Sequence, residues 1–264
     1  IEGMIAVLLR KICPVLNWLG VGAFYDRYSK DLSFYSFRKD SENYKELYGL
    51  NFLNIGSGGF VHKKWTNYDY PGQTEFYKKL QGESGVDFCP IDLRHSLPDC
   101  PPGSVGLIYM SHTLEHLPFD VAEKVIKHAH EILTEGGCLR IVVPDVKRLF
   151  EYAKLSSLKF GEKDFQQPAE LSKLIFTPSS LADVETIEAL FMKTSAFEDF
   201  ASRLVLMAES DKAPEQEYPP DYHMSFWTTD SLREIAERVG YARFRVALRN
   251  VSEFAPFRNE WTFD

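Results

Sequence analysis

The sequence predicts an α/β fold: a mostly parallel seven-stranded sheet with helices on both faces, plus a helical insertion. Short apolar runs alternate with segments of helical periodicity in the middle of the chain. Several of these runs stop at glycine or polar residues, as strands in parallel sheets commonly do. The chain has 264 residues, 44% of them hydrophobic and 14% aromatic, which is enough to build a substantial core.

Seven short runs are expected to form the sheet. They are residues 53–55, 65–70, 86–91, 105–110, 138–143, 242–248 and 260–263. Only about ten residues separate the glycines after the first run from Asp69. A full crossover helix needs a dozen or more residues, so we expect a loop between the first two strands.

Two helices are indicated by apolar stripes at helical spacing. The first begins near Asp120, which is placed to cap it, and ends at residues 136–137. The second runs from about Thr229 or Asp230 to Gly240.

These patterns divide the chain into three regions. Residues 50–149 and 226–264 are expected to form the cofactor-binding core, and residues 4–49 an amino-terminal helical segment. Residues 150–225 lack strand alternation and are expected to be a helical insertion that acts as a substrate lid. Residues 1–3 are typical of an expression remnant, and we expect the natural chain to begin at Met4.

The apolar segment 4–24 is interrupted by Arg10, Lys11 and Pro14. This leaves it well short of the roughly 20 apolar residues that a membrane-spanning helix needs. We favour a helix packed on the domain or against a second subunit, as in a homodimer. Peripheral contact with a membrane surface is the less favoured alternative.

Charge and cysteine content narrow the function classes. The net charge of −8 argues against nucleic acid as a partner, because a broad basic surface is missing. The four cysteines form no Cys-x-x-Cys pair, so we expect neither a metal site nor a disulfide framework. A reducing, cytoplasmic location fits this cysteine usage.

Glycines and polar residues follow the predicted strands, where open α/β sheets bind their ligands. A glycine turn lets the backbone approach a ligand, a carboxylate after the second strand can accept from a ribose diol, and an acid beside an apolar residue suits a purine. In chain order the candidates are Gly56, Ser57 and Gly58, then Asp69, then Asp92 and Leu93, then Ser111 and His112.

In order and spacing, five segments resemble the class I S-adenosylmethionine-dependent methyltransferases, particularly the group called type 11. They are residues 53–58, Asp69, and residues 91–93, 111–117 and 133–145. The resemblance covers about residues 50–148. It implies a Rossmann-like methyltransferase fold and S-adenosyl-L-methionine as the cofactor.

The resemblance also implies a role for each candidate. Gly56 and Gly58, with Ser57 between them, border the methionine part of the cofactor, and Asp69 binds the ribose hydroxyls. Asp92 and Leu93 hold the adenine, while Ser111 and His112 line the reactive end. Asn54 stands where the family commonly has an acid that organises the aminoacyl end, so we expect a different affinity or pose there.

Methylation of a hydroxyl needs a base, and histidine suits that task near neutral pH. His112 and His223 are the candidate bases, whereas the resemblance favours an anchoring role for His116. Asp145 either faces the acceptor or begins the next helix. By analogy with the group, we expect O-methylation of a small polar metabolite or glycan.

Aromatic residues of the insertion can line the acceptor pocket, although such residues more often form core. They are Phe176, Phe191, Phe197, Tyr218, Tyr222, Phe226 and Trp227.

Two other functions compete with the methyltransferase. An NAD(P)-dependent oxidoreductase uses a similar sheet, but Val61 replaces the third glycine of its G-x-G-x-x-G fingerprint. A methyltransferase-like scaffold without catalysis is the second rival, and Asn54 and the short first crossover favour it. Binding of a nicotinamide cofactor distinguishes the first rival, and absence of turnover the second.

Overall fold

The computed structural model describes residues 21–25, 32–36, 49–58, 61, 65–72, 74–151, 154, 190, 193–210 and 223–246. The chain divides into two compact units, residues 1–51 with 245–264 and residues 52–244. The predicted strand 260–263, most of the amino-terminal segment and most of the insertion lie outside the described residues.

The first unit contains an antiparallel pair of strands, β1 (Val21–Tyr25) and β2 (Leu32–Ser36), in the register Val21↔Ser36 to Tyr25↔Leu32. The predicted helical segment 4–49 is therefore wrong for residues 21–25 and 32–36. The physical reason is local composition, because β1 and β2 each carry two adjacent aromatic residues, a residue type that favours a strand over a helix.

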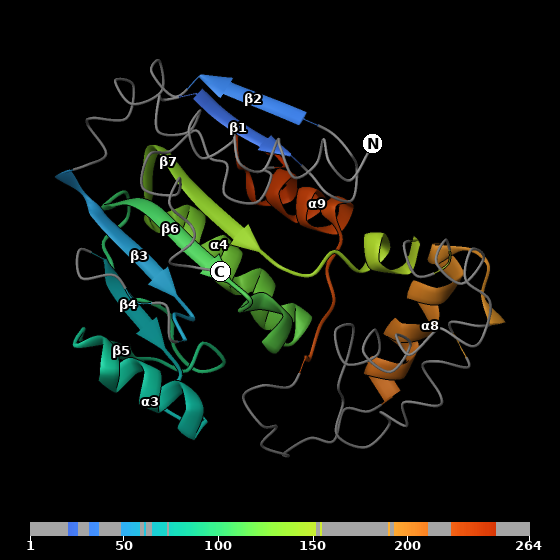
Figure 1. Ribbon diagram of the computed structural model, residues 1–264, viewed down its shortest axis with the longest axis horizontal. Helices are drawn as coiled ribbons and strands as arrows, with labels where there is room; N and C mark the ends of the chain where they lie inside the picture. The colour runs from blue at the N-terminus through green and yellow to red at the C-terminus, as the bar shows by residue number, and fades with distance from the viewer. Residues whose placement is uncertain are drawn as a thin grey trace, which may run out of the picture. The chain divides into compact units, whose positions relative to one another are not determined.

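The second unit is built on a sheet of five strands: β3 (Asn51–Ile55), β4 (Thr66–Asp69), β5 (Cys89–Pro90), β6 (Val105–Ser111) and β7 (Leu133–Val142). Their spatial order is β5-β4-β3-β6-β7 (Figure 1). The pairs β3·β4, β4·β5 and β6·β7 are parallel. This is the Rossmann-like arrangement that the sequence predicts.

Helices connect and flank the strands. α3 (Glu75–Ser84) joins β4 to β5, and α4 (Phe119–Ile132) joins β6 to β7. The two crossovers run in opposite directions along the sheet, so the right-handed rule places α3 and α4 on opposite faces. α8 (Phe197–Ser210) is a described helix of the segment 150–225, for which the sequence analysis expects helices. The pattern analysis did not predict α3.

The core lies between the sheet and α4. Residues 105–110 of β6 are all buried, and α4 contributes the buried side chains Ala122, Val125, Ile126, Ala129 and Ile132. Ile235 of α9 (Thr229–Val239) joins the same cluster. The predicted apolar stripe of α4 is thereby confirmed. The strands that lead to the site are packed against this core.

The helix boundaries are partly as predicted. α9 begins after a capping box formed by Thr228 and Ser231 and ends at Gly240, whose φ is 106°. α4 instead begins after Pro118, which puts Asp120 in its first turn rather than at the cap. It also ends at Ile132, because the chain turns directly into β7 at Leu133.

The expectation of seven strands in the main sheet stays a prediction beyond the five described there. Residues 242–246 form no strand, so the predicted strand 242–248 is wrong over that part, and the remainder of it lies outside the described residues. Within the part of the chain that the structure describes, no helix is both long enough and apolar enough to cross a lipid bilayer.

Candidate functional site

The site lies where the strand order reverses. From β3 the chain moves outward to β4 and β5 and then crosses back to β6 and β7, so the ends of β3 and β6 are neighbours. Open α/β sheets bind ligands at such a point, outside the carboxyl ends of the strands. Of the predicted residues, Gly56 directly follows β3 and Ser111 is the last residue of β6.

Gly56 and Thr113 join the two strand ends. Thr113 Oγ1 lies 3.0 Å from the carbonyl oxygen of Ile55 and 3.3 Å from that of Ser111, and it donates across the switch point. Gly56 has φ 72°, and a Cβ atom placed on it would lie 2.1 Å from Thr113 Oγ1. Only glycine fits here, for reasons of both backbone conformation and space.

Gln81, which the sequence patterns did not indicate, connects the glycine turn to Asp69 by hydrogen bonds. Gln81 of α3 donates through Nε2 to the carbonyl oxygen of Gly58 at 2.9 Å and also to Asp69 Oδ2 in a short contact. Asp69 Oδ1 accepts from the backbone N–H of Tyr70 at 2.9 Å, and Asp69 is only 2% exposed. The predicted ribose-binding acid therefore ends β4 as expected, but Gln81 covers it.

Asn54 and Ser57 are both buried beside this turn. Asn54 Nδ2 donates to Asn67 Oδ1 at 3.1 Å, so its side chain links β3 to β4 at directly paired positions. For Ser57 Oγ, the described residues supply no hydrogen-bond partner. A buried hydroxyl without a partner is costly, which makes Ser57 a ready contact for a polar ligand group.

Asp92 lies after β5, as predicted, and is held by its neighbours. Its Oδ1 accepts from the backbone N–H and Nε of Arg94, at 3.0 and 2.9 Å, and its Oδ2 accepts from Arg94 Nη2 at 2.7 Å. His95 Nδ1 lies 3.0 Å from the same Oδ2. The hydrogen bonds from Arg94 lower the pKa of Asp92 to about 2.

Replacing Arg94 by glutamine is expected to raise the pKa of Asp92 from about 2 toward its ordinary value of 3.8. Because the folded-state pKa is depressed, the ionised pair stabilises the fold above pH 3.8, and this contribution is lost as the pH falls through about 2. An NMR titration of the side-chain carboxyl measures the shift.

A matched control is Lys124→Gln, which removes an exposed ion pair with Asp120 and should leave the pKa of Asp92 unchanged. An unaltered pKa in Arg94→Gln would show that another group holds Asp92 ionised.

Leu93 and Ser111 are two further residues predicted to contact the cofactor. Leu93 is partly buried and packs against the core cluster under the sheet, so a purine would meet only its exposed part. Ser111 is the last residue of β6 and is paired with Val142 of β7, which places it at the sheet edge that the site requires.

His112 is oriented by Glu115. His112 Nδ1 lies 2.9 Å from Glu115 Oε1, while the His112 side chain is 61% exposed and the Glu115 side chain 2%. His112 also has φ 51°, a left-handed conformation that is unusual for a residue other than glycine and that clusters at functional sites. An ionised carboxylate only accepts, so the imidazole donates to Glu115 through Nδ1, and Nε2 is its other ring nitrogen.

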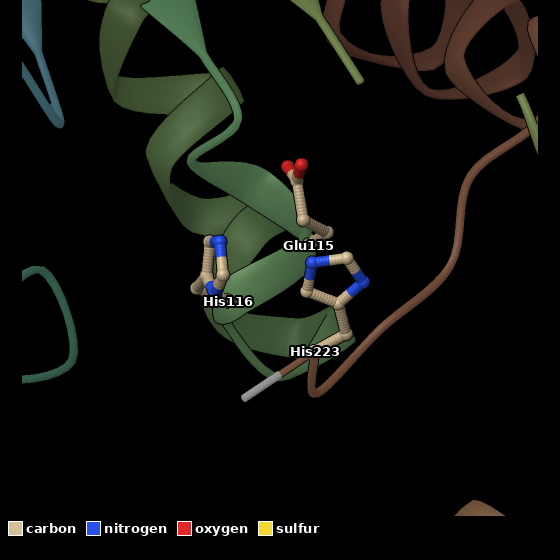
Figure 2. A group of neighbouring side chains, drawn as sticks. All are labelled: Glu115, His116 and His223. Atoms are coloured by element: carbon tan, nitrogen blue, oxygen red, sulfur yellow. The ribbon is translucent and has the colours of Figure 1, made fainter. Parts of the chain in front are cut away.

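His223 lies beside His116, with the ring centroids 4.8 Å apart (Figure 2). The chain at residues 223–225 is held against the short 3-10 helix η2 (Leu114–His116), because the backbone N–H groups of Met224 and Ser225 both donate to the carbonyl oxygen of Glu115. The structure thus brings Glu115, His116 and His223 together, and the anchoring role of His116 stays a prediction.

Asp145 directly precedes the helical residues 146–151, and its carboxylate is engaged by hydrogen bonds. Its Oδ1 accepts from the backbone N–H of Arg148 at 3.2 Å, and its Oδ2 accepts from Thr229 Oγ1 at 2.8 Å. Phe226 and Trp227 are 8% and 1% exposed and belong to core clusters. Of the predicted pocket aromatics, these two are therefore core residues, and four others lie outside the described residues.

Four residues of the site were not singled out for their roles from the sequence: Gln81, Arg94, Thr113 and Glu115. Gln81 could have been found through Thr74 and Gly85, which bound α3 and are typical of helix ends. Glu115 is three residues from His112, a spacing that indicates a pair only once the turn after β6 is known.

Neither a protein-family model nor a curated protein matches the chain. Among solved structures, the chain is similar to DhpI in a DhpI–SAM–HEP complex, at 22% identity and a TM-score of 0.30. The similarity covers 39% of this chain and 51% of the DhpI chain. The chain thus spans about half the length of DhpI.

Two further solved structures are similar over 80% of this chain. A SAM-dependent methyltransferase from Aquifex aeolicus is 12% identical, is covered over 82% of its length and gives a TM-score of 0.36. An O-methyltransferase family protein from Burkholderia thailandensis is 9% identical, is covered over 54% and gives a TM-score of 0.38. Overlaps at this level carry no residue role or acceptor over to this chain.

Proposed function

We propose that the chain is an S-adenosylmethionine-dependent methyltransferase that transfers the methyl group to an oxygen of a small polar metabolite or glycan. The observation that carries the proposal is the His112–Glu115 pair, which follows β6 at the switch point and flanks Thr113, the residue that contacts the glycine turn. Methyl transfer to a hydroxyl needs an aligned methyl donor and a base for the hydroxyl proton, and this end of the sheet offers a close-approach turn and a candidate base.

The strand ends supply a contact for each part of the cofactor. The backbone of Gly56 and Gly58 would border the methionine part, with the Ser57 hydroxyl, for which the described residues supply no partner, as a polar contact. The ribose diol would bind Asp69 by replacing the amide of Gln81, which donates to the same carboxylate. Both hydroxyls of a ribose can donate to a carboxylate, so this exchange restores the contact that is lost.

The adenine amine would bind Asp92 by a similar exchange. Four donors, three from Arg94 and one from His95, already occupy the roughly four lone-pair sites of this carboxylate. The His95 side chain is 78% exposed, so its contact is the one most easily displaced. Arg94 would stay in place and keep the carboxylate ionised.

The chemistry is a displacement at the methyl carbon. An oxygen lone pair of the acceptor forms the new C–O bond, the C–S bond breaks, and its electron pair returns to sulfur, which leaves S-adenosylhomocysteine. The hydroxyl proton moves to His112 Nε2, while Glu115 holds the Nδ1–H and stabilises the imidazolium. His223 is the second candidate base of this proposal.

Turnover with a panel of hydroxyl-bearing acceptors tests the proposal. The purified chain is incubated with S-adenosylmethionine carrying a deuterated methyl group, and products are identified by mass spectrometry. Transfer of the label to oxygen of a sugar or small metabolite supports the proposal. Labelling confined to protein or RNA would contradict the proposed acceptor class, and cofactor binding without any turnover would favour the scaffold alternative.

A further inference from the structure

We propose that Glu115, His116 and His223 form a binding site for a divalent first-row transition-metal ion. One potential ligand atom from each residue lies within 4.8 Å of the others, and Figure 2 shows the three side chains gathered around η2. The sequence spacing of the cysteines gave no hint of such a site, because it is built from one pair of neighbours and a histidine more than a hundred residues away.

The spacing of the donor atoms is close to what one ion requires. Metal–nitrogen and metal–oxygen bonds of about 2.1 Å place two ligands of one ion at most about 4.2 Å apart. The donor atoms, all within 4.8 Å of one another, would therefore need only a small inward movement. His116 and His223 are half-buried, so neither side chain is fully enclosed.

The second, independent observation is the burial of Glu115. Its side chain is 2% exposed, and while Oε1 accepts from His112, Oε2 has no hydrogen-bond partner in the part of the chain that the structure describes. An unpartnered buried carboxylate oxygen costs free energy, and a bound ion is one of the accepted explanations for such a group. A cation ligated by Oε2 would satisfy it.

The backbone holds the ligands in place before any ion binds. Met224 and Ser225 donate to the carbonyl oxygen of Glu115 at 2.6 and 3.1 Å, which fixes the segment beginning at His223. Ser225 Oγ donates to the carbonyl oxygen of Leu114 at 3.0 Å, and Ser225 is fully buried. A site supported in this way loses little freedom on binding, which favours affinity.

The donor set selects the class of metal. Imidazole nitrogens suit zinc, iron, nickel and copper, whereas magnesium and calcium prefer oxygen ligands. Two histidines and one carboxylate leave open positions on the ion. Glu115 would contact the ion through one oxygen and His112 through the other, so the ion would lie near the candidate base. If the proposed function holds, the open positions of the ion would therefore take an oxygen of the acceptor.

Calorimetric titration of chelator-treated protein with ZnCl₂, in the absence of cofactor, tests the site. We expect one Zn²⁺ to bind per chain and to raise the Tm. The separate variants His116→Gln and His223→Gln should weaken binding by about 100-fold or more, since loss of a second-shell partner alone costs 10- to 100-fold. His95→Gln is the matched control, because it removes a surface histidine outside the cluster.

Two results would overturn the site. One is absence of Zn²⁺ binding by the folded wild-type chain, and the other is equal affinity in the wild type and both cluster variants. Tighter binding of Mg²⁺ than of Zn²⁺ would contradict the proposed metal class. S-adenosylhomocysteine binding is measured separately without metal, so failure of the site and failure of the proposed function remain distinguishable.

Discussion

Replacing His112 by glutamine is expected to lower kcat for methyl transfer by about 10²- to 10⁴-fold, the usual contribution of a positioned general base. The reason is that Nε2 is the atom proposed to take the acceptor proton, and the glutamine amide cannot accept one. Glu115 acts through His112, so Glu115→Gln should lower kcat less and leave the affinity for the cofactor nearly unchanged.

Single-turnover measurements with saturating S-adenosylmethionine check this expectation. His128→Gln is the control, since His128 Nε2 contacts the carbonyl oxygen of Pro98 and the glutamine amide preserves that donor. An unchanged kcat in His112→Gln would contradict a base role for His112 and would direct attention to His223→Gln. A loss of cofactor affinity with unchanged kcat would show that His112 only lines the cofactor.

Replacing Gly56 by alanine is expected to destabilise the fold and to abolish cofactor binding. The left-handed φ of 72° costs about 1–2 kcal/mol for a residue with a Cβ atom. That Cβ would also overlap Thr113, whose Oγ1, Cγ2 and Cβ lie 2.1, 2.7 and 2.9 Å from it. Overpacking adds typically 1–3 kcal/mol, so the total loss is about 2–5 kcal/mol in the free energy of unfolding.

Urea unfolding and S-adenosylhomocysteine titration of the variant check both parts. Gly85→Ala is the matched control, because Gly85 has a similar φ of 64° but open space around its Cβ position. It should lose only the conformational part and keep cofactor binding. Equal destabilisation of the two variants would show that the contact between Gly56 and Thr113 does not constrain the site.

Local sequence patterns predicted the middle of the sheet well. Five runs of residues became β3 to β7, and the apolar stripe of α4 faces the core as expected. Asp69, Asp92 and Ser111 all stand at or just after strand ends. These features depend on residues close in sequence, where hydrophobic periodicity and turn residues are informative.

The long-range contacts of the site residues were not predictable from local sequence patterns. Gln81 covers Asp69 from a helix twelve residues away, and His223 meets His116 only because the chain returns after the insertion. The strands β1 and β2 were missed because the whole segment 4–49 was interpreted as helical, although both strands carry aromatic residues that favour a strand. Long-range packing, not local propensity, sets the contacts of Gln81 and His223.

Titration calorimetry of the purified chain with S-adenosylhomocysteine tests the central claim most directly, with NADH as the competing ligand and Asp69→Asn as a nearly isosteric variant. We expect micromolar binding of S-adenosylhomocysteine by the wild type and no binding of NADH. Asp69→Asn should bind S-adenosylhomocysteine clearly less tightly, because the group that accepts from the ribose loses its charge. Absence of binding by the folded wild-type chain, or preferential binding of NADH, would contradict the central claim.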